Sequence, residues 1–132
     1  MAGNVTGFQL TYKFVPSDTQ PTVGVDQVVA YGTNPNEVVV PTADNEKAVG
    51  IVTYQYEDLA GMPVAVQLDR VAEAVAAEAI AYGDELIAAV GGKVKKSSGV
   101  SSGVVNVLGV AQNTALEGGK VQVLIKPFSK KV

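Results

Sequence analysis

The sequence predicts an all-β protein: a small barrel or sandwich built from two tandem β-repeats and preceded by an extended N-terminal arm. Two observations lead to this prediction. Apolar runs of four to six residues alternate with clusters of Gly, Pro, Asn, Asp and Ser, which is typical of short strands joined by turns. Three sequence blocks also recur in the same order, which indicates an internal duplication.

The individual strands follow from apolar runs bounded by turn residues such as Asn34-Pro35, Gly91-Gly92 and Gly118-Gly119. Each run has the length of an ordinary strand. In chain order, the predicted strands are Phe8–Val15, Gln27–Tyr31, Glu37–Val40, Val49–Tyr54, Val64–Leu68, Glu85–Ala89, Val104–Ala111 and Val121–Lys126.

The first predicted strand has one apolar and mostly aromatic face, made by Phe8, Leu10, Tyr12 and Phe14. Two interpretations stay open. The segment is either the first strand of the chain's own core, or a strand that adds to the edge of a neighbouring protein. Since residues 16–21 resemble a linker, we divide the chain into an arm or first strand at 1–20 and a single β domain at 21–132.

Residues 69–82 fit two predictions. The segment is rich in Ala, could be capped by Asp69 and ends before Gly83, which favours a helix. The alternation of Val71, Glu73 and Val75 with Ala instead favours a strand that ends in a turn near residues 76–77.

The internal repeat rests on three aligned blocks. Asp26–Ala30 aligns with Asp84–Ala88, Val49–Val52 with Leu108–Ala111, and Val64–Leu68 with Val121–Ile125, at offsets of 58, 59 and 57 residues. The alignment predicts copies at about residues 21–76 and 77–127 that pack on each other, because neither is large enough to bury a core alone. Gly50 and Gly109 lie inside predicted strands, which indicates a bulge or a close backbone approach.

Composition excludes several classes of enzyme and metal site. The chain has no Cys and no His, so it has no disulfide, thiol nucleophile, Ser/His/Asp triad or zinc site of the usual ligands. The adjacent acids Glu57-Asp58 and Asp84-Glu85 point to opposite faces of an extended chain and do not converge. We therefore expect no enzymatic activity, no cofactor and no metal.

The distribution of charge and hydropathy indicates whether the chain binds nucleic acid or a membrane. Residues 1–92 hold three basic and twelve acidic residues, whereas residues 93–132 hold seven and one. Lys93, Lys95 and Lys96 lie in a loop without Arg or aromatic neighbours, so we expect a solvated charge run and no nucleic-acid binding. No run reaches 18 apolar residues, and the N-terminus does not resemble a signal peptide. We therefore expect synthesis in a cytoplasm and no association with a membrane.

An ordered series of short segments resembles the capsid cement, or head decoration, proteins of tailed double-stranded DNA phages. The segments are Val71–Val75, Ala79–Leu86, Gly92–Val94, Val107–Ala111 and Ala115–Leu124. Their order and spacing carry the resemblance, which covers residues 64–127 and extends loosely over 21–68. The resemblance also favours a strand within residues 69–82.

This resemblance implies a virion structural protein that binds the outer capsid surface and stabilises the expanded head. Its implied partners are the major capsid protein and further copies of itself in a homotrimer. Phe8, Leu10, Tyr12 and Phe14 are then the candidate capsid or inter-subunit contacts. The alternative is another β-structured phage component, such as a tail or fibre-base protein.

Overall fold

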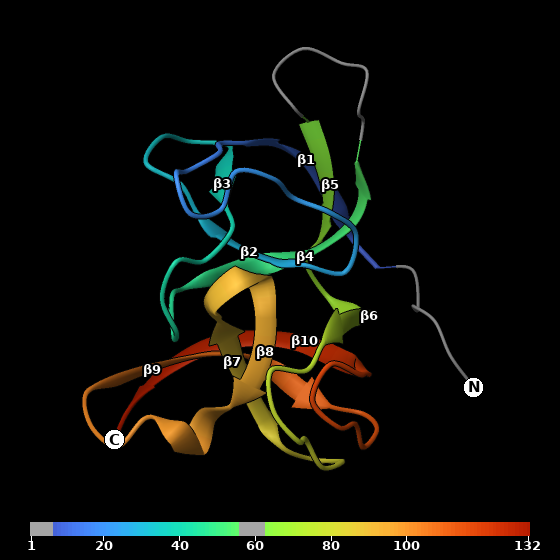
Figure 1. The fold of residues 1–132 in the computed structure, drawn as a ribbon, viewed down its shortest axis with the longest axis vertical. Helices are drawn as coiled ribbons and strands as arrows, with labels where there is room; N and C mark the ends of the chain where they lie inside the picture. The colour runs from blue at the N-terminus through green and yellow to red at the C-terminus, as the bar shows by residue number, and fades with distance from the viewer. Residues whose placement is uncertain (1–6, 56–62) are drawn as a thin grey trace.

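The computed structural model describes residues 7–55 and 63–132, and it confirms the all-β prediction (Figure 1). The strands are β1 (Gln9–Phe14), β2 (Val28–Tyr31), β3 (Glu37–Val39), β4 (Ala48–Gln55), β5 (Pro63–Gln67), β6 (Arg70–Val75), β7 (Glu85–Ala89), β8 (Lys93–Lys96), β9 (Val104–Ala111) and β10 (Lys120–Lys131). Two short 3-10 turns, η1 (Val90–Gly92) and η2 (Ser97–Gly99), flank β8.

The strands form two sheets that are stacked along the long axis of the molecule (Figure 1). The first is a closed barrel of order β1-β3-β2-β4-β5, in which β1 pairs with both β3 and β5. The second sheet has the order β6-β10-β9-β7-β8. Its two edges meet at a parallel bridge between Ala76 and Val94, so the second sheet is also nearly closed.

The two sheets repeat the same pairing pattern, with β1–β5 corresponding in order to β6–β10. This correspondence includes β1 and β6, which the sequence comparison did not align. Corresponding pairs are Tyr12–Val64 and Ala74–Val121, Phe14–Val38 and Ala76–Val94, and Val52–Val66 and Ala111–Val123. The duplication is therefore visible in the strand register as well as in the sequence.

The two strand glycines make the close backbone approach that the sequence predicted. A Cβ atom on Gly50 would lie 2.1 Å from the carbonyl oxygen of Gln67, and one on Gly109 would lie 2.1 Å from that of Leu124. The register also shifts at the same place in both copies, where β4 pairs with β2 and β9 pairs with β7. Each sheet therefore needs a residue without a side chain at this position.

One block of the sequence alignment is shifted by one residue. The sequence paired Asp26 with Asp84, but Asp26 N donates to Val52 O as Gly83 N donates to Ala111 O, each at 2.8 Å. The equivalent of Asp26 is therefore Gly83. Both have left-handed backbone angles, with φ of 73° and 90°, so the turn geometry is kept although the residue type differs.

The ambiguous segment 69–82 contains strand β6 and no helix. Ala72 and Ala74 point into the core and are fully buried, while their neighbours are partly exposed, which is the alternation of a strand. Strand β8 was wrongly predicted to be part of a loop. It contributes a single core residue, Val94, among lysines, so its hydrophobic signal is weak.

The interior of each sheet is filled differently. The barrel has its own core of Phe14 and surrounding Val side chains. The core of the second sheet includes Val28, Ala48 and Ile51, which project from the outer face of the barrel. The barrel therefore serves as a lid on the core of the second sheet.

Candidate binding surfaces

Three of the predicted contact residues, Leu10, Tyr12 and Phe14, lie on β1, which belongs to the chain's own barrel, and Phe8 immediately precedes it. Leu10 pairs with Val66 and Tyr12 with Val64, two fully buried core residues, so the apolar face of β1 points into the barrel. Of the two interpretations of residues 1–20, an arm or a first strand, the structure has a barrel strand over Gln9–Phe14, while residues 1–6 lie outside the described residues.

Exposure changes steadily along this face. Phe14 is 1% exposed, Tyr12 is half-buried, and Leu10 and Phe8 are 43% and 58% exposed. Tyr31 of β2, which is 59% exposed, lies on the same inward-facing side because it pairs with the buried Val38. We call the group Phe8, Leu10, Tyr12 and Tyr31 the open end of the barrel.

The corresponding end of the second sheet is closed. The positions equivalent to Leu10, Tyr12 and Tyr31 are Ala72, Ala74 and Ala88, and each is 0% exposed. They share a core with the three barrel residues that form the lid. The same end of the same fold is thus covered in one copy and uncovered in the other.

Tyr12 and Tyr31 are neighbours at the open end. Burial, with a smaller contribution from the neighbouring Tyr31, raises the pKa of Tyr12. The ammonium group of Lys47 lies 5.9 Å from the centre of the Tyr31 ring, within the range of a cation–π contact. Tyr12 and Tyr31 are amphipathic side chains of the type enriched in protein interfaces.

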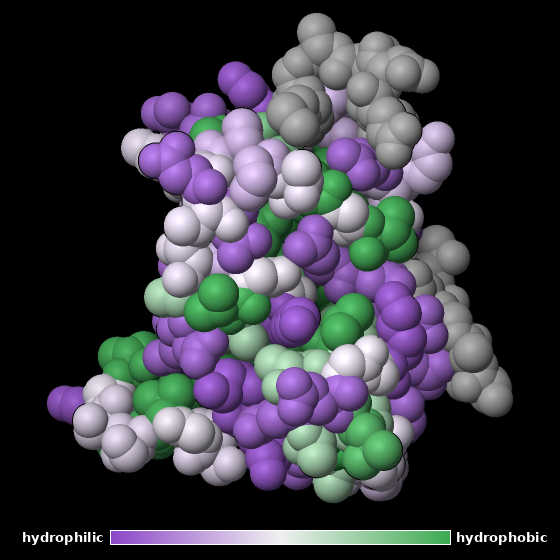
Figure 2. All heavy atoms as spheres, viewed as in Figure 1, coloured by the Kyte–Doolittle hydropathy of each residue, from purple (hydrophilic) through white to green (hydrophobic). Residues whose placement is uncertain are grey.

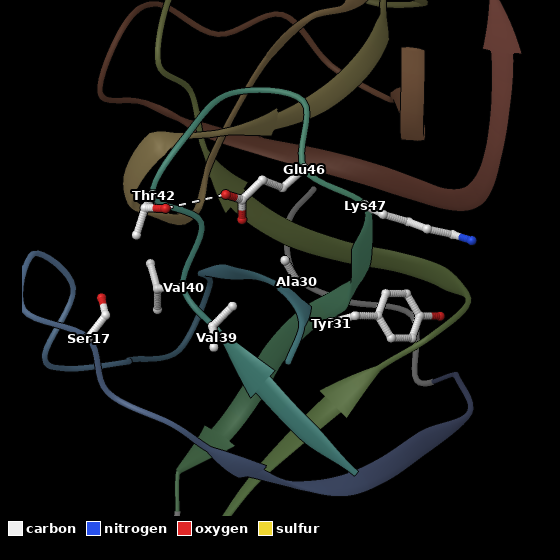
Figure 3. Close-up of a pocket in the computed structure, with 8 residues that line it drawn as sticks. All are labelled: Ser17, Ala30, Tyr31, Val39, Val40, Thr42, Glu46 and Lys47. Carbon is white, nitrogen blue, oxygen red and sulfur yellow. Dashed lines mark hydrogen bonds between the residues drawn. The ribbon is translucent and has the colours of Figure 1, made fainter. Parts of the chain in front are cut away.

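A groove of 480 Å³ lies beside Tyr31 (Figure 3). It is lined by Ser17, Ala30, Tyr31, Val39, Val40, Thr42, Glu46 and Lys47. Its carboxylate, Glu46, accepts a 3.3 Å hydrogen bond from the Thr42 hydroxyl. Among these lining residues, the Glu46 carboxylate faces Thr42, whereas the Lys47 ammonium group lies near Tyr31. The two groups therefore form no acid–base pair.

A second apolar surface lies in the two loops before β7 and β10. Tyr82 and Leu116 are 72% and 76% exposed, the highest values among the large apolar side chains of the described residues. The loops are held together because Ile80 and Ala115 bond each other through both backbone groups, at 2.8 and 2.9 Å. We call Tyr82 and Leu116 the loop tip.

Sequence reasoning did not find the loop tip. Tyr82 ended the segment that fitted both helix and strand, and Leu116 precedes a turn, where an apolar residue carries no periodic signal. Figure 2 shows that apolar residues on the visible face are scattered in small groups among polar ones. Exposed apolar residues therefore indicate a binding surface here only where several of them lie together in the structure.

The acidic pairs do not form a catalytic site in the described residues. Asp84 accepts a hydrogen bond from the Ala81 amide, while Glu85 binds Lys130 and Ser97. Glu57 and Asp58 lie outside the described residues. Within 7–55 and 63–132, no three potential metal ligands come together, and no helix is long and apolar enough to cross a membrane.

The barrel is fastened to the second sheet by the loop between β3 and β4. Asn45 donates its side-chain amide to Val104 O and accepts from Asn106 N, both at 2.8 Å. Its backbone oxygen accepts from the Asn106 side chain at 2.9 Å, and its backbone amide donates to Ala88 O at 2.8 Å. A single residue thus contacts two strands of the second sheet.

We expect Asn45→Ala to lower the free energy of unfolding by about 2–4 kcal/mol. The change removes two side-chain hydrogen bonds and places Ala at φ 68°, a left-handed conformation. Denaturant unfolding measures the loss. Asn36→Ala is the matched control, because Asn36 has φ 66° and no side-chain hydrogen bond within the described part of the chain. Equal losses in both variants would show that the hydrogen bonds contribute nothing.

Ion pairs reinforce the same junction. Lys95 Nζ lies 3.0 Å from Asp44 Oδ2, and Lys120 Nζ lies 2.6 Å from Asp26 Oδ2. The Val90 amide and Lys95 hold the pKa of Asp44 below its ordinary value, and Asp44 raises the pKa of Lys95. Within the second sheet, Lys130 similarly lowers the pKa of Glu85.

These shifts predict an acid-sensitive stability. A carboxyl group whose pKa is lower in the folded state stabilises the fold above its unfolded pKa, and the contribution is lost as the pH falls through the folded value. We therefore expect the free energy of unfolding to decrease below about pH 4. Denaturant unfolding measured across this range checks the result. Asp44→Asn should flatten the decrease, and an identical pH profile in that variant would contradict the assignment to Asp44.

Comparison with known proteins identifies the fold. No protein-family model and no curated protein matches the sequence. Among solved structures, the chain is similar to the crystal structure of the head fiber gp8.5 N base in bacteriophage phi29, with a TM-score of 0.64 and 18% sequence identity. The match covers 90% of this chain and 93% of that chain, so it includes both sheets.

Proposed function

We propose that this chain is a structural protein of a tailed-phage virion that binds the outer surface of the head and stabilises the expanded capsid. The observation that carries the proposal is the shared fold over nearly the whole length of a phage head fiber base. The resemblance of residues 64–127 to head decoration proteins supports the same location. Since a fold alone does not imply a function, the proposal rests on these two comparisons together.

The proposed partner is the major capsid protein, and the proposed assembly is a homotrimer. In this proposal the loop tip contacts the capsid, because Tyr82 and Leu116 are highly exposed on two loops that backbone hydrogen bonds hold together. A head presents many equivalent sites, so a modest affinity at each site suffices to stabilise the shell. The activity is mechanical, and the proposal includes no catalytic step and no cofactor.

The test is binding of the purified protein to expanded heads from which accessory proteins have been removed. Cryo-electron microscopy should show added density on the outer surface at repeated local symmetry axes. Leu116→Glu should reduce the occupancy strongly, because a carboxylate in the contact loses its hydration. Val25→Glu is the matched control, since Val25 is also exposed, at 51%, but lies in another loop. Bare heads with the unsubstituted protein would overturn the proposal.

A second candidate function is the base of a head fibre, favoured by the description of the structural neighbour. Heat-induced release of DNA from the heads separates the two functions. A cement protein should raise the release temperature, whereas a fibre base should bind at the same surface without raising it.

A further inference from the structure

We propose that the open end of the barrel is the docking site for a second copy of this chain, through the outer face of that copy's second sheet. The surfaces involved are the open end, as defined above, and three apolar residues on β6, β9 and β10: Val71, Val110 and Leu124. We call these three residues the outer stripe. The proposal concerns self-association only and does not depend on what the assembled protein binds.

The first argument is the interface that already exists within the chain. The outer face of β2 and β4 covers the end of the second sheet and buries Val28 and Ile51 completely. The equivalent end of the barrel has the same strand order and the same inward-facing positions, but Leu10 and Tyr31 remain 43% and 59% exposed. One half of a repeated interface is therefore without its counterpart in the described chain.

The second argument identifies the matching surface. Val110 is equivalent to Ile51, because each directly follows the strand glycine and pairs with the next strand along the chain at the corresponding place. Leu124 pairs with Val110 on one side and with Val71 on the other, so the three form a continuous row across the sheet. All three are half-buried, whereas Ile51 is fully buried under the second sheet. Within the outer stripe, Val110 is thus the equivalent of Ile51, which already lies in an interface, and Leu124 and Val71 extend it into an apolar row.

The third argument is charge. The described residues of the barrel, 9–55 and 63–67, contain two basic and five acidic residues, whereas residues 70–131 contain eight and five. Contact between unlike sheets is therefore electrostatically favoured over contact between like sheets. The existing junction follows this rule, since Asp26 and Asp44 of the barrel meet Lys120 and Lys95.

An interface between two different surfaces has a defined consequence for assembly. Each copy offers one open end and one outer stripe, so contacts run head to tail and close into a ring when the rotation between copies allows it. A symmetric pair of open ends is a different arrangement, in which Leu10 of one copy would face Leu10 of the other.

Crosslinking can test this arrangement directly, because the chain has no native cysteine. Leu10→Cys and Leu124→Cys chains are mixed in equal amounts and treated with a short bismaleimide. The expected product joins position 10 of one chain to position 124 of another. Dominant products joining 10 to 10 or 124 to 124, or no crosslinked product, would overturn the proposal.

Sedimentation velocity of the full chain provides the second measurement. The unsubstituted protein should form oligomers, and Leu10→Glu or Leu124→Glu should weaken self-association by about 100-fold or more, because each buries a charge in the contact. Leu116→Glu at the loop tip is the matched control and should leave the oligomer intact. A protein that stays monomeric at high concentration, or oligomers that persist in both Glu variants, would contradict the proposal. If a Glu variant does not fold, the crosslinking result decides.

Discussion

Gly109→Ala should destabilise the protein by about 3 kcal/mol or more and lower its melting temperature by roughly 10 °C. The added Cβ would lie 2.1 Å from the carbonyl oxygen of Leu124, which is backbone and cannot rotate away. β9 and β10 would have to separate at the centre of the second sheet, and their ladder hydrogen bonds would lengthen. Calorimetry and denaturant unfolding measure the effect.

Gly99→Ala is the control for this substitution. Its Cβ would meet only the flexible end of Lys95, at 3.6 Å, so the change should leave the melting temperature nearly unchanged. The duplication adds an internal check, because Gly50→Ala meets the same obstacle in the barrel and should be similarly costly. If the Gly109→Ala protein had the same melting temperature as the unsubstituted protein, the strands would separate without a cost in stability.

Phe14→Ala should lower the free energy of unfolding by about 3–5 kcal/mol. Phe14 is 1% exposed and is the largest side chain in the barrel core, where it packs among Val residues. Its removal leaves a cavity that the surrounding β-strands cannot close, because strand pairing joins them in a closed ring.

This prediction separates the two interpretations of the N-terminal segment. Phe8→Ala is the control on the same strand face, and since Phe8 is 58% exposed it should cost less than about 1 kcal/mol. If residues 8–15 were an arm that binds another protein, neither change would affect the isolated chain. Unchanged denaturant unfolding of Phe14→Ala would therefore support the arm and contradict the barrel strand.

Much of the fold could be predicted because each sheet has a strong local signal. Alternating Val residues and turn clusters located most strands, and three aligned blocks located the duplication. One of these blocks contains Gly50 and Gly109, and only Gly can occupy that position in either copy. Strand β8 was missed because three of its four residues are Lys, whose charges hide the single buried Val94.

The relation between β1 and β6 could not be predicted, because their sequences share no pattern. Leu10, Tyr12 and Phe14 are large, whereas the equivalent Ala72, Ala74 and Ala76 are small. The difference follows from packing. The barrel fills its interior with its own side chains, while the second sheet leaves room for residues from the barrel. Equivalent positions therefore face different volumes, and the residue type follows the volume.

The candidate surfaces were predicted only in part. The periodicity of β1 identified an apolar face, and three of its four residues lie at the open end, but the pattern alone does not show that Phe14 is buried and Phe8 is exposed. Tyr31 joins them through strand pairing, and the loop tip forms where two distant loops meet. Such long-range proximity has no counterpart in local sequence.

The shared core also defines an order of folding during synthesis. The barrel closes with residues up to 67, and no residue of the second sheet is needed to fill its interior. The second sheet requires Val28, Ala48 and Ile51, which leave the ribosome earlier. The barrel is therefore available as a finished template when the second sheet emerges, whereas a fragment that begins at β6 would lack part of its core.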